Sequence, residues 1–81
     1  MSKAEAMFKI LKFKKEDLVS MYGNVWGERY VKAEKEIWFD YVDKDVMVCY
    51  EDGQAVYFDM KELKAINKRV KELKWGGWKN F

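Results

Sequence analysis

The side chains that carry most enzyme chemistry are scarce in this sequence of 81 residues, which has no histidine and one cysteine, Cys49. Histidine is the commonest general base and transition-metal ligand near neutral pH, so its absence excludes catalytic triads, histidine-activated thiols and the usual zinc sites. A lone cysteine excludes an internal disulfide, and the strand context of Cys49 predicts a buried structural thiol. We therefore expect no enzyme activity, no cofactor and no bound metal.

Three aspartates come closest to a metal-binding motif. Asp40, Asp43 and Asp45 resemble the spaced oxygen ligands of a calcium loop, but the glycine of the sharp turn and the distal glutamate of that motif are missing. We expect a solvated acidic turn instead. Asp43 and Asp45, with Glu51 and Asp52 further along, form an acidic stretch that could stand in for phosphates in a basic channel of a partner.

A row of lysines near the C-terminus is the main basic candidate. Asp59 and Glu62 have the spacing of a capping box, which predicts a helix that begins near Met60. Apolar residues then repeat at helical spacing, with lysines on the opposite side. The predicted core positions are Leu63, Ile66, Val70 and Leu73, and the predicted basic face is Lys61, Lys64, Lys68 and Lys71. Such a face could contact nucleic-acid phosphates, but lysines also solubilise ordinary helices and lack the arginine fork that reads bases.

Aromatic residues make up 17% of the chain and are the other candidate binding groups. Alternation along a strand that contains Ile37 and Phe39 sends Trp38 to the opposite face. Four rings are expected to be exposed in a loop, on that sheet face or in a C-terminal tail: Trp26, Trp38, Trp78 and Phe81. Exposed aromatic clusters usually mark a partner or dimer surface. The alternative is that the tail folds back to complete a small core.

Local signals place these groups on two helices and a sheet. Ser2 and Glu5 predict a capped first helix that ends near Lys12 and carries an apolar stripe of Ala4, Met7, Phe8 and Leu11. Residues 14–27 are expected to be irregular, with Trp26 in a loop. Strands are predicted over residues 29–31, 36–42, 46–50 and 55–58, the last two joined by a turn at Asp52 and Gly53. Gly76 is expected to stop the last helix, leaving residues 75–81 as an aromatic tail.

This order of elements predicts an α+β fold in one domain over residues 1–81: a helix, three or four antiparallel strands in a meander, and a second helix, with the two helices covering one sheet face. The length suffices for one small domain only. No apolar run approaches the roughly 20 residues of a membrane-spanning helix, and the N-terminal residues lack a signal-peptide pattern. We therefore expect a cytoplasmic protein that does not contact the membrane.

The net charge of +2 conceals a segregation of charge along the chain. Residues 1–15 carry five lysines and one glutamate, residues 34–59 carry eight acids and two lysines, and residues 60–81 carry seven bases and two acids. The pattern predicts a basic helical layer beside an acidic sheet and turns.

Three segments together resemble the small uncharacterised proteins encoded by phages and prophages of Gram-positive bacteria. They are AEAMFKILKF, CYEDGQAVYF with its DG turn, and DMKELKAINKRVKELKW. The resemblance covers most of the chain, although residues 21–27 depart from the pattern and the tail WGGWKNF extends beyond it. It implies that Leu63, Ile66, Val70 and Leu73 form the helix core, and it implies no catalytic residue. It also implies a role in binding a host factor, of which CRISPR effectors and other defence systems are prominent examples.

Three functions follow, in order of preference. The first is a non-catalytic protein in the host cytoplasm that binds and modulates or inhibits a host protein, such as a defence effector. The second is a nucleic-acid-binding accessory protein that uses the lysine row and the tail tryptophans, with weak binding. The third is a nucleotide binder in which Arg29, Lys32 and aromatic rings form a phosphate and stacking site at an oligomer interface. A homodimer is left open.

Overall fold

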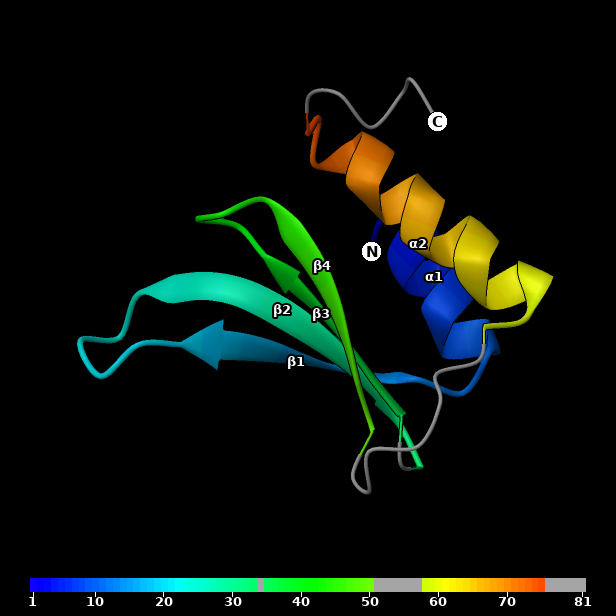
Figure 1. The fold of residues 1–81 in the computed structure, drawn as a ribbon, viewed down its shortest axis with the longest axis horizontal. Helices are drawn as coiled ribbons and strands as arrows, with labels where there is room; N and C mark the ends of the chain where they lie inside the picture. The colour runs from blue at the N-terminus through cyan, green and yellow to red at the C-terminus, as the bar shows by residue number, and fades with distance from the viewer. Residues whose placement is uncertain (34, 51–57, 76–81) are drawn as a thin grey trace. The chain divides into compact units, whose positions relative to one another are not determined.

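The computed structural model describes residues 1–33, 35–50 and 58–75. A helix is followed by four antiparallel strands and a second helix, which confirms the α+β fold class (Figure 1). The chain forms two compact units: a helical unit of Met1–Lys12 and Tyr57–Phe81, and a sheet unit of Phe13–Val56. That two helices cover one sheet face within a single domain stays a prediction.

Both helices of the helical unit begin at capped residues. In α2 (Met60–Glu72), Asp59 Oδ1 accepts the Glu62 N–H at 2.7 Å, and Glu62 Oε1 accepts the Asp59 N–H at 3.1 Å. This reciprocal capping box satisfies two N–H groups that lie outside the helical hydrogen bonds, so α2 begins where the sequence predicts. In α1 (Lys3–Ile10), Ser2 is the N-cap and its Oγ accepts the Glu5 N–H at 3.1 Å.

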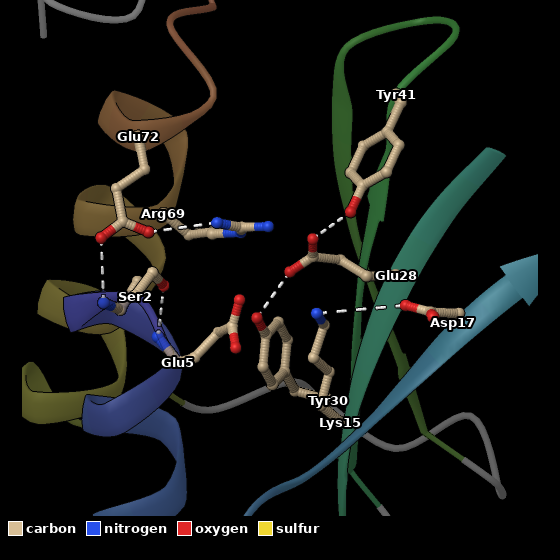
Figure 2. A network of polar contacts seen from close by, with 10 residues as sticks. Ser2, Glu5, Lys15, Asp17, Glu28, Tyr30, Tyr41, Arg69 and Glu72 are labelled. Carbon is tan, nitrogen blue, oxygen red and sulfur yellow. Dashed lines mark hydrogen bonds and ion pairs between the residues drawn. The ribbon is translucent and has the colours of Figure 1, made fainter. Parts of the chain in front are cut away.

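Glu72 joins the end of α2 to the start of α1 (Figure 2). Its Oε2 accepts the Ala4 N–H at 3.1 Å, and its Oε1 accepts Arg69 Nη1 at 3.1 Å. Because the first N–H groups of a helix carry a partial positive charge, this carboxylate stabilises α1. Burial raises the pKa of Glu72, but hydrogen bonds from Ala4, Ser2 and Arg69 outweigh burial and hold the pKa below its ordinary value.

The C-terminus of α2 differs from the prediction. The helix ends at Glu72, before Trp75 and Gly76, and Lys74 adopts the left-handed conformation with a φ of 57°. The Lys74 N–H donates to Lys71 O at 3.1 Å, and the Trp75 N–H donates to Val70 O at 3.5 Å. This pair of bonds is a Schellman motif in which lysine occupies the position that glycine usually takes. The glycine signal at position 76 was therefore misleading.

The buried face of α2 is rotated from the predicted one. Ile66 and Val70 are buried as predicted, together with Ala65 and Glu62. The prediction that Leu63 is a core residue was wrong, because Leu63 remains 38% exposed. At 100° per residue, the buried residues Glu62, Ala65, Ile66 and Val70 form a face centred between Glu62 and Ile66, which leaves Leu63 at its edge. Leu73, the last predicted core residue, is the half-buried C-cap.

The sheet unit is a meander of four antiparallel strands in the order β1-β2-β3-β4, formed by β1 (Lys14–Val19), β2 (Val25–Lys32), β3 (Lys35–Asp40) and β4 (Asp45–Tyr50). The prediction that residues 14–27 are irregular was wrong, because they form β1 and the start of β2. The first four residues of β1 are charged, and Leu18 is its one buried residue, so the strand shows no apolar alternation. Residues 51–57, which include the predicted Asp52–Gly53 turn, lie outside the described residues, and Phe58 is not in a strand.

The register of the four strands defines two faces, since directly opposite residues share a face. On the first, called the Tyr30 face, Tyr30, Ile37 and Phe39 are buried, and the Tyr30 and Phe39 rings meet edge to face at 5.8 Å. The opposite one, called the Trp38 face, carries three rows across the sheet: Lys14, Val31, Glu36 and Cys49; Glu16, Arg29, Trp38 and Met47; and Leu18, Gly27, Asp40 and Asp45. The predicted separation of Trp38 from Ile37 and Phe39 is confirmed.

Candidate protein-binding surface

The connection between β1 and β2 exposes four apolar side chains. We call residues 19–25 the hairpin tip; within it Val19, Met21, Tyr22 and Val25 are 53%, 89%, 83% and 51% exposed. Residues 18–27 contain no charged side chain, although 37% of the chain is charged, and they form its longest uncharged run. The centres of protein interfaces are likewise depleted of charged residues. The hairpin tip therefore has the composition of a docking surface.

The backbone of the hairpin tip is held by hydrogen bonds that converge on Ser20. The Ser20 N–H donates to Asn24 O at 2.8 Å, and the Gly23 N–H donates to Ser20 O at 3.0 Å. Ser20 Oγ accepts the N–H groups of Tyr22 and Asn24, each at 3.2 Å. Gly23 has a φ of 87°, which a residue with a side chain rarely adopts. Because the turn is already ordered, little backbone entropy would be lost when Met21 and Tyr22 are buried by a partner.

Behind the hairpin tip, Arg29 organises the centre of the Trp38 face. Its Nη2 lies 3.0 Å from Glu16 Oε2, its Nη1 lies 3.2 Å from Glu36 Oε1, and its guanidinium carbon sits 5.7 Å from the centre of the Trp38 ring. Trp38 Nε1 donates to the same Glu36 oxygen at 3.0 Å. The hydrogen bond that Arg29 donates to Glu16, and then the charges of Glu16 and Glu36, raise the pKa of Arg29 despite its desolvation.

A β-bulge brings Trp26 onto the Trp38 face. Leu18 pairs with Gly27 and Val19 pairs with Val25, so Trp26 is the extra residue of β2. A bulge changes the direction of a side chain, and the Trp26 and Trp38 rings meet with their centres 6.3 Å apart and their planes at 54°. The prediction that Trp26 lies in a loop was wrong, because Trp26 is part of β2.

The structure brings together two of the four predicted aromatic site residues. Trp26 and Trp38 are half-buried rather than fully exposed, because they pack against each other and Trp38 also contacts Arg29 and Glu36. Trp78 and Phe81 lie outside the described residues.

The predicted acidic stretch is in part a turn at the same end of the sheet as the hairpin tip. Asp40 Oδ1 accepts the N–H groups of Val42 and Asp43 at 2.8 and 3.1 Å, which forms the turn between β3 and β4. Asp43 and Asp45 are exposed, and Asp45 lies directly opposite Asp40. Like charges placed opposite each other destabilise a sheet, so a basic group of a partner would relieve this repulsion. Glu51 and Asp52 lie outside the described residues.

Glu28 is a fully buried carboxylate on the Tyr30 face (Figure 2). Its Oε2 accepts the Tyr30 hydroxyl at 2.5 Å, and its Oε1 accepts the Tyr41 hydroxyl. Hydrogen bonds of this kind are what allow a carboxylate to be buried. In the sequence, Glu28 is a charged residue just before the predicted strand of residues 29–31, and nothing there marks it as buried. Because the side chain is inaccessible to solvent, we assign it a structural role.

The predicted basic face is present on α2. Lys61, Lys64 and Lys71 are exposed, and Lys68 is half-buried. By sequence, the helical unit carries ten bases and four acids, a net charge of +6, whereas the sheet unit carries six bases and ten acids, a net charge of −4. The two units therefore differ in the sign of their net charge.

The residues suggested for a nucleotide site are not brought together. Arg29 lies on the Trp38 face, whereas Lys32, three residues along β2, points to the opposite face and sits 4.6 Å from the centre of the Phe13 ring. Cys49 is half-buried on the Trp38 face opposite Glu36, rather than fully buried as expected. Among residues 1–33, 35–50 and 58–75, no group of three or more His, Cys, Asp or Glu side chains is placed to hold a metal ion.

In comparisons with known proteins, the chain matches no family model, no curated protein and no solved structure. In the part of the chain that the structure describes, neither helix is long and apolar enough to cross a membrane.

Sequence reasoning missed the hairpin tip, although the signal was present. The sequence prediction places Met21 and Tyr22 in an irregular segment, although a run of ten uncharged residues surrounds them. An uncharged run that contains a glycine and an asparagine between two β-branched residues is typical of a hairpin turn. What the sequence could not show is that the four apolar side chains remain exposed.

Proposed function

We propose that this protein acts by binding a partner protein through the hairpin tip, without a catalytic step. The observation that carries the proposal is the exposure of Val19, Met21, Tyr22 and Val25 on an ordered turn inside an uncharged run of ten residues. Exposed apolar side chains clustered in this way are typical of interaction sites rather than of solvated loops.

Met21 and Tyr22 are the residues best placed to enter a pocket of the partner. They are the two most exposed apolar side chains of the hairpin tip, and both can bury a large apolar area. The Tyr22 ring has few torsions to restrict, and the flexible Met21 side chain can adapt to the shape of a pocket. Truncation of an interface tyrosine that fills a pocket typically weakens binding by about 2 kcal/mol or more. The pair is therefore expected to contribute most of the binding free energy.

Acidic residues beside the hairpin tip determine which charge the partner is expected to carry around its pocket. Asp43 and Asp45 are exposed in the neighbouring turn, and the sheet unit has a net charge of −4. Opposite charges at the rim of an interface speed association and fix its orientation. The partner is therefore expected to present an apolar pocket surrounded by lysine or arginine side chains.

The resemblance to small phage and prophage proteins supports a host protein as this partner. A basic rim around an apolar pocket is also what a nucleic-acid-binding host factor, such as a defence effector, would offer to an acidic surface. Binding at such a rim would compete with the nucleic acid and thereby inhibit the factor.

A capture experiment with a Met21→Ser and Tyr22→Ser double variant tests this proposal. The full chain is immobilised, and proteins captured from a lysate of Gram-positive bacteria are identified and quantified by mass spectrometry. Because both side chains are exposed, the variant should melt at the temperature of the parent protein and lose the captured partner. Met60→Ser is the matched control, since Met60 is also exposed, at 67%, but lies in the helical unit. Capture that survives in the double variant would contradict the proposal.

Nucleic-acid binding is the second candidate, because the helical unit has a net charge of +6 and three of the four predicted lysines are exposed. Contacts between lysines and phosphates release counterions, so this binding should weaken steeply as salt is added. Fluorescence anisotropy with a labelled single strand, at low and physiological salt, measures it. We expect weak binding that a Lys61, Lys64, Lys68 and Lys71 quadruple alanine variant abolishes.

A further inference from the structure

Within the helical unit, side chains at α1 and α2 line an open apolar groove of about 180 Å³. Its lining residues are Met7 and Ile10 from α1, the C-cap residue Leu11, and Lys61 and Lys64 from α2. Ile10 is 76% exposed, so an apolar side chain at the groove stands largely in solvent. The groove belongs to a different unit from the hairpin tip and does not depend on the function proposed for the tip.

The size of the groove limits what it can hold. Pockets for small-molecule ligands usually enclose about 300–1,000 Å³. A volume of about 180 Å³ instead suits one large apolar side chain, which is how a partner segment anchors itself in a protein interface. Met7 adds an adaptable wall, since methionine adjusts to side chains of different shapes.

The two lysines that line the groove determine which charge a bound partner segment should carry. Lys61 and Lys64 line the groove and are both exposed, so their aliphatic stems can cover the apolar floor while their ammonium groups remain in water. The helical unit as a whole has a net charge of +6. Acidic residues on either side of the anchor would therefore be attracted to the groove, and basic residues would be repelled.

We propose that this groove binds an acidic peptide segment of a partner protein, with one large apolar side chain seated on Met7, Ile10 and Leu11 and carboxylates paired with Lys61 and Lys64. The site provides a contact for acidic segments, whereas the hairpin tip has acidic surroundings and selects basic ones.

An NMR titration of the full chain tests the proposal. The probe is a synthetic pentapeptide with one phenylalanine between two pairs of aspartates, and the backbone amide shifts of Ile10, Leu11, Lys61 and Lys64 are followed. Replacing the phenylalanine of the probe by alanine should weaken binding about tenfold or more, because the anchor loses most of its buried apolar area. A probe with lysines in place of the aspartates should not bind measurably.

Variants of the protein separate the apolar and the charged contributions. Lys61→Ala with Lys64→Ala should weaken binding by about two- to tenfold and remove most of its salt dependence, whereas the matched control Lys71→Ala should change neither. Ile10→Asp should abolish binding while the melting temperature is kept. The Met21→Ser and Tyr22→Ser variant should bind the pentapeptide normally, which separates this site from the hairpin tip.

Three results would overturn the proposal. They are amide shifts outside the groove, equal binding of the acidic and basic probes, and binding that Ile10→Asp leaves intact. A doubled solution mass that Ile10→Asp reverses would also overturn it, because the groove would then be occupied by a second copy of the chain.

Discussion

At position 27 the absence of a side chain allows β2 and β3 to pair. A Cβ atom on Gly27 would lie 2.5 Å from Phe39 O and 3.1 Å from Leu18 Cδ1. The backbone oxygen is fixed by the sheet, so it cannot move aside as the end of a flexible side chain can. Gly27 follows the bulged residue Trp26, which means that the same two positions set both the pairing of β2 with β3 and the direction of the Trp26 ring.

We therefore expect Gly27→Ala to lower the free energy of unfolding by about 1–3 kcal/mol, as overpacking of a filled site usually does. Gly23→Asn is the matched control, because a Cβ at Gly23 meets nothing within 4 Å and asparagine tolerates a positive φ. Chemical denaturation of both variants measures the difference. Equal stability of Gly27→Ala and the parent protein would show that β2 and β3 do not pair as described.

Among the elements, α1 depends on α2 for one of its N-terminal hydrogen bonds. Glu72 accepts the Ala4 N–H and is held by Arg69, and its pKa is lowered although burial alone would raise it. A carboxyl group with a lowered pKa in the folded state stabilises the protein above its ordinary pKa. That contribution is lost as the pH falls through the folded-state pKa.

Glu72→Gln should therefore lower the free energy of unfolding by about 1 kcal/mol at neutral pH, because the charge-assisted bonds become neutral ones. The difference between variant and parent should shrink as the pH falls from the ordinary pKa of a glutamate through the lower folded-state pKa of Glu72. Asp43→Asn, an exposed acid in the sheet unit, serves as the control. Urea titrations at a series of pH values measure the effect, and a difference that persists unchanged into acid would contradict it.

At the end of α2, a substitution is expected to raise the free energy of unfolding. Lys74 has a φ of 57°, which is unfavourable for a residue with a Cβ atom. Lys74→Gly should raise the free energy of unfolding by up to about 1 kcal/mol, since glycine is the preferred residue at this position of a Schellman motif. Lys71→Gly, inside the last turn of the same helix, should lower it by roughly 0.5–1 kcal/mol. Thermal melts that rank the two variants in the reverse order would contradict the described helix end.

How well the sequence predicted an element depended on whether its determinants are local. The capping box of Asp59 and Glu62 and the alternation around Ile37 and Phe39 act between neighbours, and both were predicted correctly. β1 was missed because it is stabilised by pairing with β2 rather than by an apolar pattern of its own. Trp26 was predicted to lie in a loop because no sequence pattern indicates the β-bulge that makes it part of β2.

Across the whole molecule, charge and exposed apolar surface are distributed unequally between the two units. The sheet unit has a net charge of −4 and carries the uncharged hairpin tip, whereas the helical unit has a net charge of +6 and carries the lysine row and the groove. We therefore expect long-range attraction to favour differently charged partners at the two units, and the apolar contacts to decide which of them stay bound.

The most direct test of the account compares two variants in binding to the captured partner by calorimetry. One is Met21→Ser with Tyr22→Ser, and the other replaces Lys61, Lys64, Lys68 and Lys71 by alanine. Loss of a buried interface anchor corresponds to about 2 kcal/mol or more, so the hairpin-tip variant should bind at least about 30-fold more weakly, while the lysine variant should stay within about threefold of the parent protein. The reverse ranking would contradict the central claim that the hairpin tip carries partner binding.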